Sequence, residues 1–166
     1  MLYLLAIAAV IALLYYVFSD RTPVKPLNKA LLSIREYVPA IPPGAPSHHW
    51  SDGGRYASEV ENDAMYQPAI ARLAGEHGPG NADEKCLALL VCDDANPFQD
   101  KAIAVFIDGL LVGYLAHNDA LKLHRNLGHQ DLAGQLTSCD AVIRGGGLWN
   151  GKRLSYAVWL DLSPFN

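Results

Sequence analysis

The chain has 166 residues, which is enough for one globular domain and an appendage. Its formal net charge is −4, but residues 56–166 alone hold eight Lys/Arg against fourteen Asp/Glu, a net of −6. Because neutralised phosphates supply most non-specific affinity for nucleic acids, this acidic balance argues against a strong general nucleic-acid binder. The three cysteines are an odd number without close pairing, which indicates reduced, buried thiols and excludes a disulfide framework.

Residues 2–18, from Leu2 to Phe18, contain no charged side chain. As a helix this run would span about 25 Å, the short end of what crosses a bilayer core, and tyrosines stand near both ends. The alternative is a cleaved signal peptide, but no Lys or Arg precedes the run and Tyr-Tyr-Val-Phe is a poor cleavage region. We therefore predict a single-pass transmembrane helix over residues 1–19, in contact with the lipid bilayer. Four Lys/Arg follow the run and none precedes it, which predicts a cytoplasmic C-terminal domain at the inner membrane.

Residues 20–54 are predicted to be a juxtamembrane connector, because six prolines interrupt them. Between these prolines, residues 27–38 place apolar side chains at helical spacing, with Asn28 as a candidate cap. This short helix could lie on the membrane surface or pack on the globular domain, and the sequence leaves both open. Residues 41–51 are expected to be extended and mobile.

The globular part, residues 55–166, begins with a strand and a helix. Residues 55–61 alternate loosely and predict the first strand. Residues 66–74 have apolar positions at helical spacing, and Pro68 suits the first helical turn. Residues 86–92 are apolar on both faces, which predicts a buried strand or part of a small barrel.

Two apolar runs, residues 102–107 and 110–115, follow a polar loop and are joined by Asp108-Gly109. Asp and Gly tolerate the positive φ angles of a type I′ turn, so this stretch predicts a β-hairpin. Residues 117–127 then predict a helix, with Asn118 as its cap and Gly128 just after its end. Its buried side is expected to consist of Leu121, His124 and Leu127.

A second hairpin is predicted over residues 139–162, with its turn at Asn150-Gly151. Three consecutive glycines at 145–147 would permit a bulge or a sharp bend. The order is therefore strand, helix, strand, hairpin, helix, hairpin. This order predicts a mainly β domain with α insertions, folded as a small antiparallel β-barrel.

The string NPFQDKAIAVFIDGLLVGYL resembles the HIRAN domain family. The matching positions are those of the strand entry and of the second strand: Asn96, Pro97, Phe98, Ala102, Ile103, Val105, Val112, Gly113, Tyr114 and Leu115. The sequence departs from the family at Gln99, where an Asp is usual, and at Lys101, where an Asn is usual. The resemblance implies an OB/SH3-like barrel over residues 55–166.

The resemblance also implies recognition of single-stranded DNA, in particular of 3′-hydroxyl ends. The scarcity of enzymatic motifs separately predicts a non-catalytic protein without a cofactor. Residues carried over to the binding site by position are Tyr66, Asn96, Phe98, Gln99, Lys101, Tyr114 and His117. Bases would stack on the aromatic rings, at about 1–3 kcal/mol each. Gln99 can still donate and accept hydrogen bonds, but it lacks the charge that would reject a terminal phosphate.

Each of these residues also has an ordinary structural interpretation. Phe98 could plug the barrel end, Tyr66 and Tyr114 could be core or rim aromatics, and His117 could be a surface residue at a helix start. Six cations could form a basic patch or a plain solvated surface: Lys101, Lys122, Arg125, Arg144, Lys152 and Arg153.

Two other functions are compatible with the sequence. An acidic barrel tethered at the cytoplasmic face of the membrane could scaffold a protein partner. Asp93, Asp94 and Asp100 could bind a divalent ion and serve a metal-dependent nuclease. No acidic-x-Lys pair follows them, no cysteine pair accompanies His48-His49, and the glycine run lacks the Lys-Ser/Thr of a phosphate-binding loop, so we predict neither a catalytic centre nor a metal site.

Overall fold

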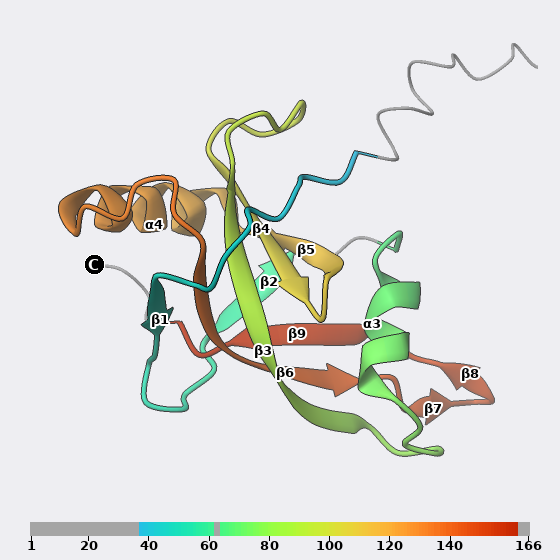
Figure 1. Cartoon of the computed structure of the whole chain (residues 1–166). Helices are drawn as coiled ribbons and strands as arrows, with labels where there is room; N and C mark the ends of the chain where they lie inside the picture. The colour runs from blue at the N-terminus through green and yellow to red at the C-terminus, as the bar shows by residue number, and fades with distance from the viewer. Residues whose placement is uncertain (1–36, 62–63, 163–166) are drawn as a thin grey trace, which may run out of the picture. The chain divides into compact units, whose positions relative to one another are not determined.

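A computed structural model describes residues 37–61 and 64–162, and residues 38–166 form one compact unit. Figure 1 shows its elements in chain order. They are β1 (His48–Trp50), β2 (Ser58–Glu61), α3 (Gln67–Ala74), β3 (Ala82–Asp93), β4 (Ala102–Ile107), β5 (Leu110–Leu115), α4 (His117–His129), β6 (Thr137–Gly145), β7 (Leu148–Trp149), β8 (Lys152–Arg153) and β9 (Tyr156–Leu160).

Six strands close into an antiparallel barrel. Their order is β6-β3-β4-β5-β2-β9, and β9 returns to pair with β6. β1 pairs in parallel with the first part of β6, at residues 137–139, and β9 pairs with the later part, at residues 141–145. The prediction of a mainly β fold with α insertions and a small antiparallel barrel is confirmed.

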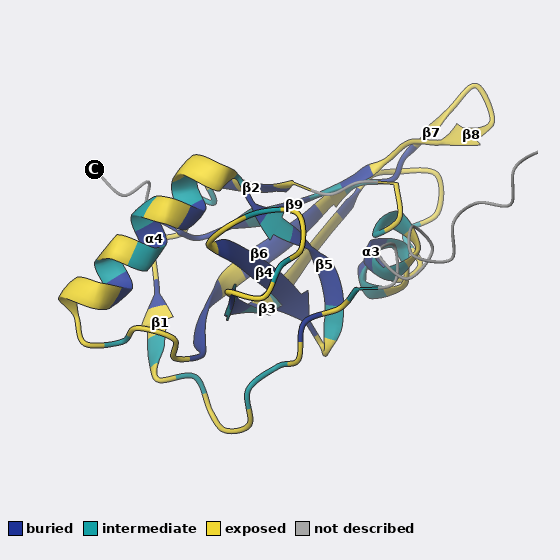
Figure 2. Ribbon diagram, turned by 90° about the horizontal axis from the view of Figure 1, so that it is seen from above, coloured by how far each residue is buried: buried dark blue, intermediate teal, exposed yellow. Residues whose placement is uncertain are grey.

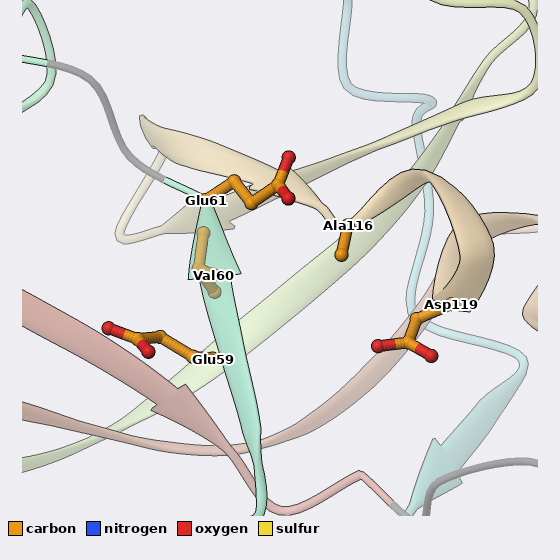
Figure 3. A pocket seen from close by; sticks show the side chains of 5 residues that line it. All are labelled: Glu59, Val60, Glu61, Ala116 and Asp119. Carbon is orange, nitrogen blue, oxygen red and sulfur yellow. The ribbon is translucent and has the colours of Figure 1, made fainter.

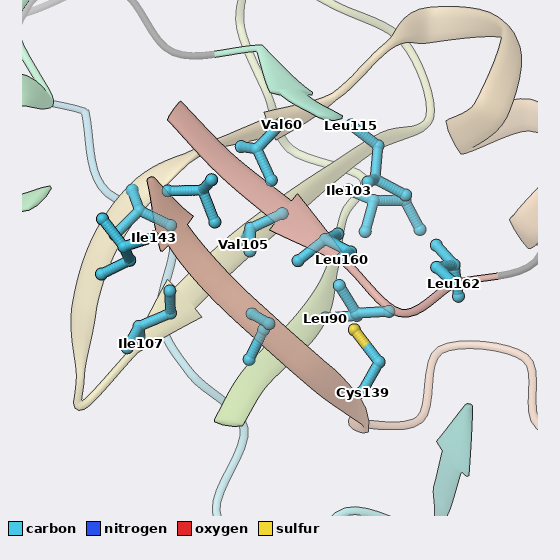
Figure 4. Packing of buried hydrophobic residues seen from close by; sticks show 14 of the residues in the cluster. Val60, Leu90, Ile103, Val105, Ile107, Leu115, Cys139, Ile143, Leu160 and Leu162 are labelled. Atoms are coloured by element: carbon cyan, nitrogen blue, oxygen red, sulfur yellow. The ribbon is translucent and has the colours of Figure 1, made fainter. Parts of the chain in front are cut away.

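The barrel interior is a continuous apolar core (Figure 4). Inward-facing residues from all six strands contribute, among them Val60, Leu90, Val105, Ile143 and Leu160. The two helices cover opposite ends of the barrel (Figures 1 and 2) and bury one side each in the same core. The alternation of buried and half-buried residues along β9 is the pattern expected for a strand with one face on a core.

A second, smaller apolar cluster lies on the outer face of β3, β4 and β5. It consists of Val91, Ala104, Phe106, Leu111 and Leu136, with Ile41 packed against it. All six residues of β4 are buried: Ile103, Val105 and Ile107 belong to the interior core, and Ala104 and Phe106 belong to the outer cluster. Burial on both faces explains why the sequence of the hairpin contains two continuous apolar runs instead of an alternation of apolar and polar residues.

Both predicted turns are present. Asp108 and Gly109 have φ angles of 47° and 75°, and Asn150 and Gly151 have φ angles of 49° and 74°. Positive φ at both central residues is the geometry of a type I′ turn, which suits the twist of the flanking strands. The second hairpin does not end with β6 and β9, because the short strand pair β7–β8 extends it beyond them.

The structure corrects three local predictions. Within the segment expected to be mobile, β1 pairs with β6 and Trp50 is buried in the core. Helix α4 begins after Ala116 and not after Asn118, and it runs through Gly128 to His129. Its buried side consists of Ala120, Leu123 and Leu127, because Ala120 is small enough to approach the barrel closely while Leu121 lies on the solvent side.

The predicted transmembrane helix lies outside the described residues. Among residues 37–61 and 64–162, no helix is long and apolar enough to cross a membrane. The predicted short helix at 27–38 also lies outside them, except for Tyr37 and Val38, which are not helical.

Candidate functional site

The loop between β3 and β4, residues 94–101, is held in shape by Asn96. Its side-chain oxygen accepts hydrogen bonds from the backbone N–H groups of Phe98 at 2.9 Å and Gln99 at 3.0 Å. Its amide nitrogen donates to the buried carboxylate of Asp93 at 2.9 Å. Asn96 therefore forms an Asx-type turn and connects it to Asp93.

Phe98 stands on this braced loop with its ring in solvent. Its exposed fraction is 66 %, so it does not plug the barrel end. The loop projects from the barrel between β3 and β4 (Figure 1). A large aromatic side chain kept exposed on an ordered loop is available for stacking or for contact with a partner.

Tyr66 and Tyr114 come together beside the same loop. Their ring centroids are 6.4 Å apart in an edge-to-face arrangement. Tyr114 extends from the outer face of β5, and its hydroxyl donates to the Asp93 carboxylate at 3.4 Å. Sequence reasoning treated Asp93 only as a metal-ligand candidate, whereas in the structure it connects Asn96 to Tyr114. The close spacing of Asp93 and Asn96 was a signal for the first contact, but nothing local predicts the second.

Gln99 and Lys101 differ in what they can offer a ligand. The Nε2 atom of Gln99 is buried and has no hydrogen-bond partner within the part of the chain that the structure describes. The ammonium group of Lys101 lies 3.1 Å from the carboxylate of Asp94. This hydrogen bond and the charge of Asp94 raise the pKa of Lys101, so its positive charge is already paired.

The remaining predicted residues do not gather at this loop. His117 is exposed on the first turn of α4. The predicted basic patch is divided among carboxylate partners, since Lys122 pairs with Asp119 and Arg144 pairs with Asp83. Surface pairs of this kind contribute little to stability, but they reduce the local positive potential.

Near α4, a cavity of about 470 Å³ opens between β2 and the start of the helix. Three carboxylates surround it, those of Glu59, Glu61 and Asp119, together with Val60 and Ala116 (Figure 3). The cavity is adjacent to the strand that carries Tyr114, because Glu61 of β2 pairs with Tyr114 of β5. The three negative charges would repel a phosphate and attract a cationic group.

The groups available for catalysis are limited. Across residues 37–61 and 64–162, no set of three or more His, Cys, Asp or Glu side chains is arranged to hold a metal ion. Burial is the main cause that raises the pKa of the Cys86 thiol to about 11 and that of the Cys139 thiol to about 12. Both thiols are therefore protonated at neutral pH and are poor nucleophiles.

Comparisons with protein-family models, with curated proteins and with solved structures found no match for this chain. Any function of the candidate site is therefore inferred from its own geometry. That geometry consists of an exposed aromatic ring, a braced loop, a pair of tyrosines and a net negative charge.

Proposed function

We propose that this protein is a membrane-anchored, HIRAN-like barrel of OB/SH3 type that recognises the end of a nucleic-acid single strand, most specifically a DNA 3′ end. The observation that carries the proposal is the exposed Phe98 ring on a loop fixed by Asn96. A ring on a braced loop can stack on a base without the cost of ordering the loop backbone, and such a stack is worth about 1–3 kcal/mol.

The charges around the loop favour an end over a continuous strand. Asp100 is exposed in the loop, Asp94 is paired with Lys101, and Asp93 is buried beside the loop. Carboxylates accept hydrogen bonds from a free hydroxyl and repel a terminal phosphate. With few unpaired cations near the loop, contacts to successive phosphates would add little affinity.

The first test measures binding of the full chain to short labelled strands by fluorescence anisotropy. One set of strands ends in a 3′-hydroxyl and the other in a 3′-phosphate. We expect tighter binding to the hydroxyl end, and a fall of about 5- to 150-fold in Phe98→Ala, the equivalent of losing one stacked base. The slope of log K against log salt should be about −1 or shallower, because each neutralised phosphate contributes about −0.7.

Two control variants make the result specific. Phe98→Tyr keeps an aromatic face and should bind as the wild type does. Leu87→Ala removes another exposed apolar side chain, on β3, and should have no effect. Absence of binding at low salt would refute the proposal, and a steep salt slope with equal affinity for both ends would replace it with general strand binding.

A second candidate is a protein-interaction module tethered at the cytoplasmic face of the membrane. The acidic cavity beside α4 favours it, because Glu59, Glu61 and Asp119 would suit a basic segment of a partner. In that case Phe98→Ala would leave partner binding intact, while Glu61→Gln would weaken it and reduce its dependence on salt.

A further inference from the structure

The short hairpin β7–β8 exposes apolar side chains far from the candidate loop. It projects from the barrel at the end opposite α4 (Figures 1 and 2). Trp149 has an exposed fraction of 68 %, Leu154 of 50 % and Leu148 of 46 %. Isolated exposed apolar residues need no explanation, but three within seven positions on one projection do.

The base of this hairpin is firmly attached to the loop between α3 and β3. Arg153 donates to the carbonyl oxygens of Gly146 at 2.6 Å and Gly78 at 3.3 Å. The backbone N–H of Leu148 donates to the Pro79 carbonyl at 3.0 Å. The Asn150-Gly151 turn fixes the tip, so the exposed side chains stand on an ordered support and not on a loose loop.

One face of the hairpin combines an indole ring with a free cation. Trp149 and Lys152 are cross-strand partners and so share a face, on the opposite side from Leu148 and Arg153. Lys152 forms no ion pair with any residue that the structure describes. Residues 141–160 hold three Lys/Arg and no Asp/Glu, although residues 56–166 as a whole carry −6.

This combination matches a bilayer surface better than other partners. Indole rings favour the headgroup level of a membrane, and Lys or Arg beside them attract anionic lipids. A nucleic acid would use the guanidinium group of Arg153, but that group is already bound to backbone carbonyls. The chain also carries the uncharged run 2–18, which is predicted to contact a membrane, and 19 residues separate that run from Val38.

We propose that the β7–β8 hairpin is a membrane contact, in which Trp149 and Leu154 enter the headgroup region of an anionic bilayer and Lys152 binds lipid phosphate. This contact would orient the barrel on the membrane. It does not depend on the nucleic-acid proposal, because the hairpin and the Phe98 loop are separate parts of the surface.

The test reconstitutes the full chain in vesicles and measures quenching of tryptophan fluorescence by brominated lipids. Trp50 is buried and Trp159 is half-buried, so Trp149→Phe supplies the background signal. We expect Trp149 to be quenched by lipids brominated near the headgroup more than by lipids brominated near the methyl end. Quenching should be stronger with anionic than with zwitterionic lipid.

Charge variants in the hairpin and in the Phe98 loop distinguish which of the two contacts the membrane. Lys152→Glu should cut the membrane-contacting population about fivefold or more, the factor that corresponds to ~1 kcal/mol per cation near an anionic surface. Lys152→Arg should restore it. Lys101→Glu makes the same charge change at the Phe98 loop and should leave quenching unchanged.

Two results would overturn the proposal. The first is quenching of the wild type no greater than that of Trp149→Phe in anionic vesicles. The second is a Trp149 emission that responds to an added single strand but not to lipid, which would assign the hairpin to nucleic acid. Loss of strand binding in Phe98→Ala with unchanged Trp149 quenching would separate the two proposals.

Discussion

At the scale of single residues, Asp161 is a buried carboxylate that accepts several hydrogen bonds. It is buried, with an exposed fraction of 2 %, just after β9. It accepts hydrogen bonds from the Ser51 hydroxyl at 2.7 Å and the Gly54 backbone N–H at 2.8 Å. Burial alone would raise the pKa of Asp161, but these hydrogen bonds and those from the backbone of Asp52 and Tyr56 lower it below 3.8. Asp161 thereby fixes the loop between β1 and β2.

Asp161→Asn should destabilise the protein by ~1–3 kcal/mol at pH 7, because buried N–H and O–H donors lose an ionised acceptor. A carboxylate with a lowered pKa in the folded state stabilises that state above its ordinary pKa, and this contribution is lost as the pH falls. The difference between wild type and variant should therefore be constant above pH 5 and narrow only below about 3.8, the unshifted value. Urea unfolding at several pH values measures this difference in the free energy of unfolding.

Asp83→Asn is the matched control for this prediction. Asp83 forms an exposed pair with Arg144, so its loss should change stability by at most about 0.5 kcal/mol. A pH-independent difference between wild type and Asp161→Asn would contradict the assignment of the ionised acceptor.

At the scale of elements, the closure of the barrel depends on an irregularity in β5. Val105 of β4 pairs with Gly113 while Phe106 pairs with Leu111, so Val112 is an extra residue and forms a β-bulge. Gly113 has a φ of 145°, and a Cβ atom there would meet the Glu61 carbonyl oxygen and lie 2.7 Å from Val60 Cγ1. The bulge and the glycine together let β2 approach β5 closely enough to pair.

We therefore expect Gly113→Ala to destabilise the fold by ~1–3 kcal/mol, since β2 must move away to make room. Gly128→Ala in α4 is the control, because no atom lies within 4 Å of a Cβ there and the residue is helical. It should stabilise the protein by about 0.5–1 kcal/mol. Both values come from chemical denaturation followed by circular dichroism, and equal stability of the two variants would refute the role given to Gly113.

At the scale of the whole molecule, the compact unit includes residues that precede β2, the first strand of the barrel. Trp50 of β1 packs in the interior core with an exposed fraction of 8 %. Ile41 packs on the outer cluster, and the Ser47 N–H donates to the Leu136 carbonyl at 2.8 Å. Residues between 41 and 50 therefore cover both an edge of β6 and an outer apolar surface.

A fragment that begins at Gly54 should be less stable than one that begins at Val38 by at least ~3–5 kcal/mol, the usual effect of deleting a buried tryptophan. It should also aggregate more, because the first part of β6 becomes an exposed strand edge. Unfolding midpoints and light scattering of the two fragments test this. Equal midpoints would show that β1 is not an integral part of the fold.

Local chemistry made much of this fold predictable. Asp108-Gly109 and Asn150-Gly151 specify their turns through backbone preference alone, and the apolar runs around Asp108-Gly109 specify strands. In the candidate site, Asn96 needs only neighbours within three residues, so its role as a turn former could be inferred from the sequence.

Contacts between distant parts of the chain could not be predicted in this way. The meeting of Tyr66 with Tyr114, and of Tyr114 with Asp93, depends on how the barrel brings α3, β3 and β5 together. The buried side of α4 was also misjudged, because both possible faces are partly apolar and only the barrel surface selects between them.

The sequence by itself determined the order of strands and helices after β1, the two turns and the acidic character of the globular part, because each follows from residue types or preferences over a few positions. Only the tertiary structure decided that β1 joins the sheet, that Asp93 is a buried acceptor, and that Phe98 and Trp149 remain exposed. Burial and pairing are properties of surfaces formed by distant segments, and no local pattern encodes which of those surfaces will meet.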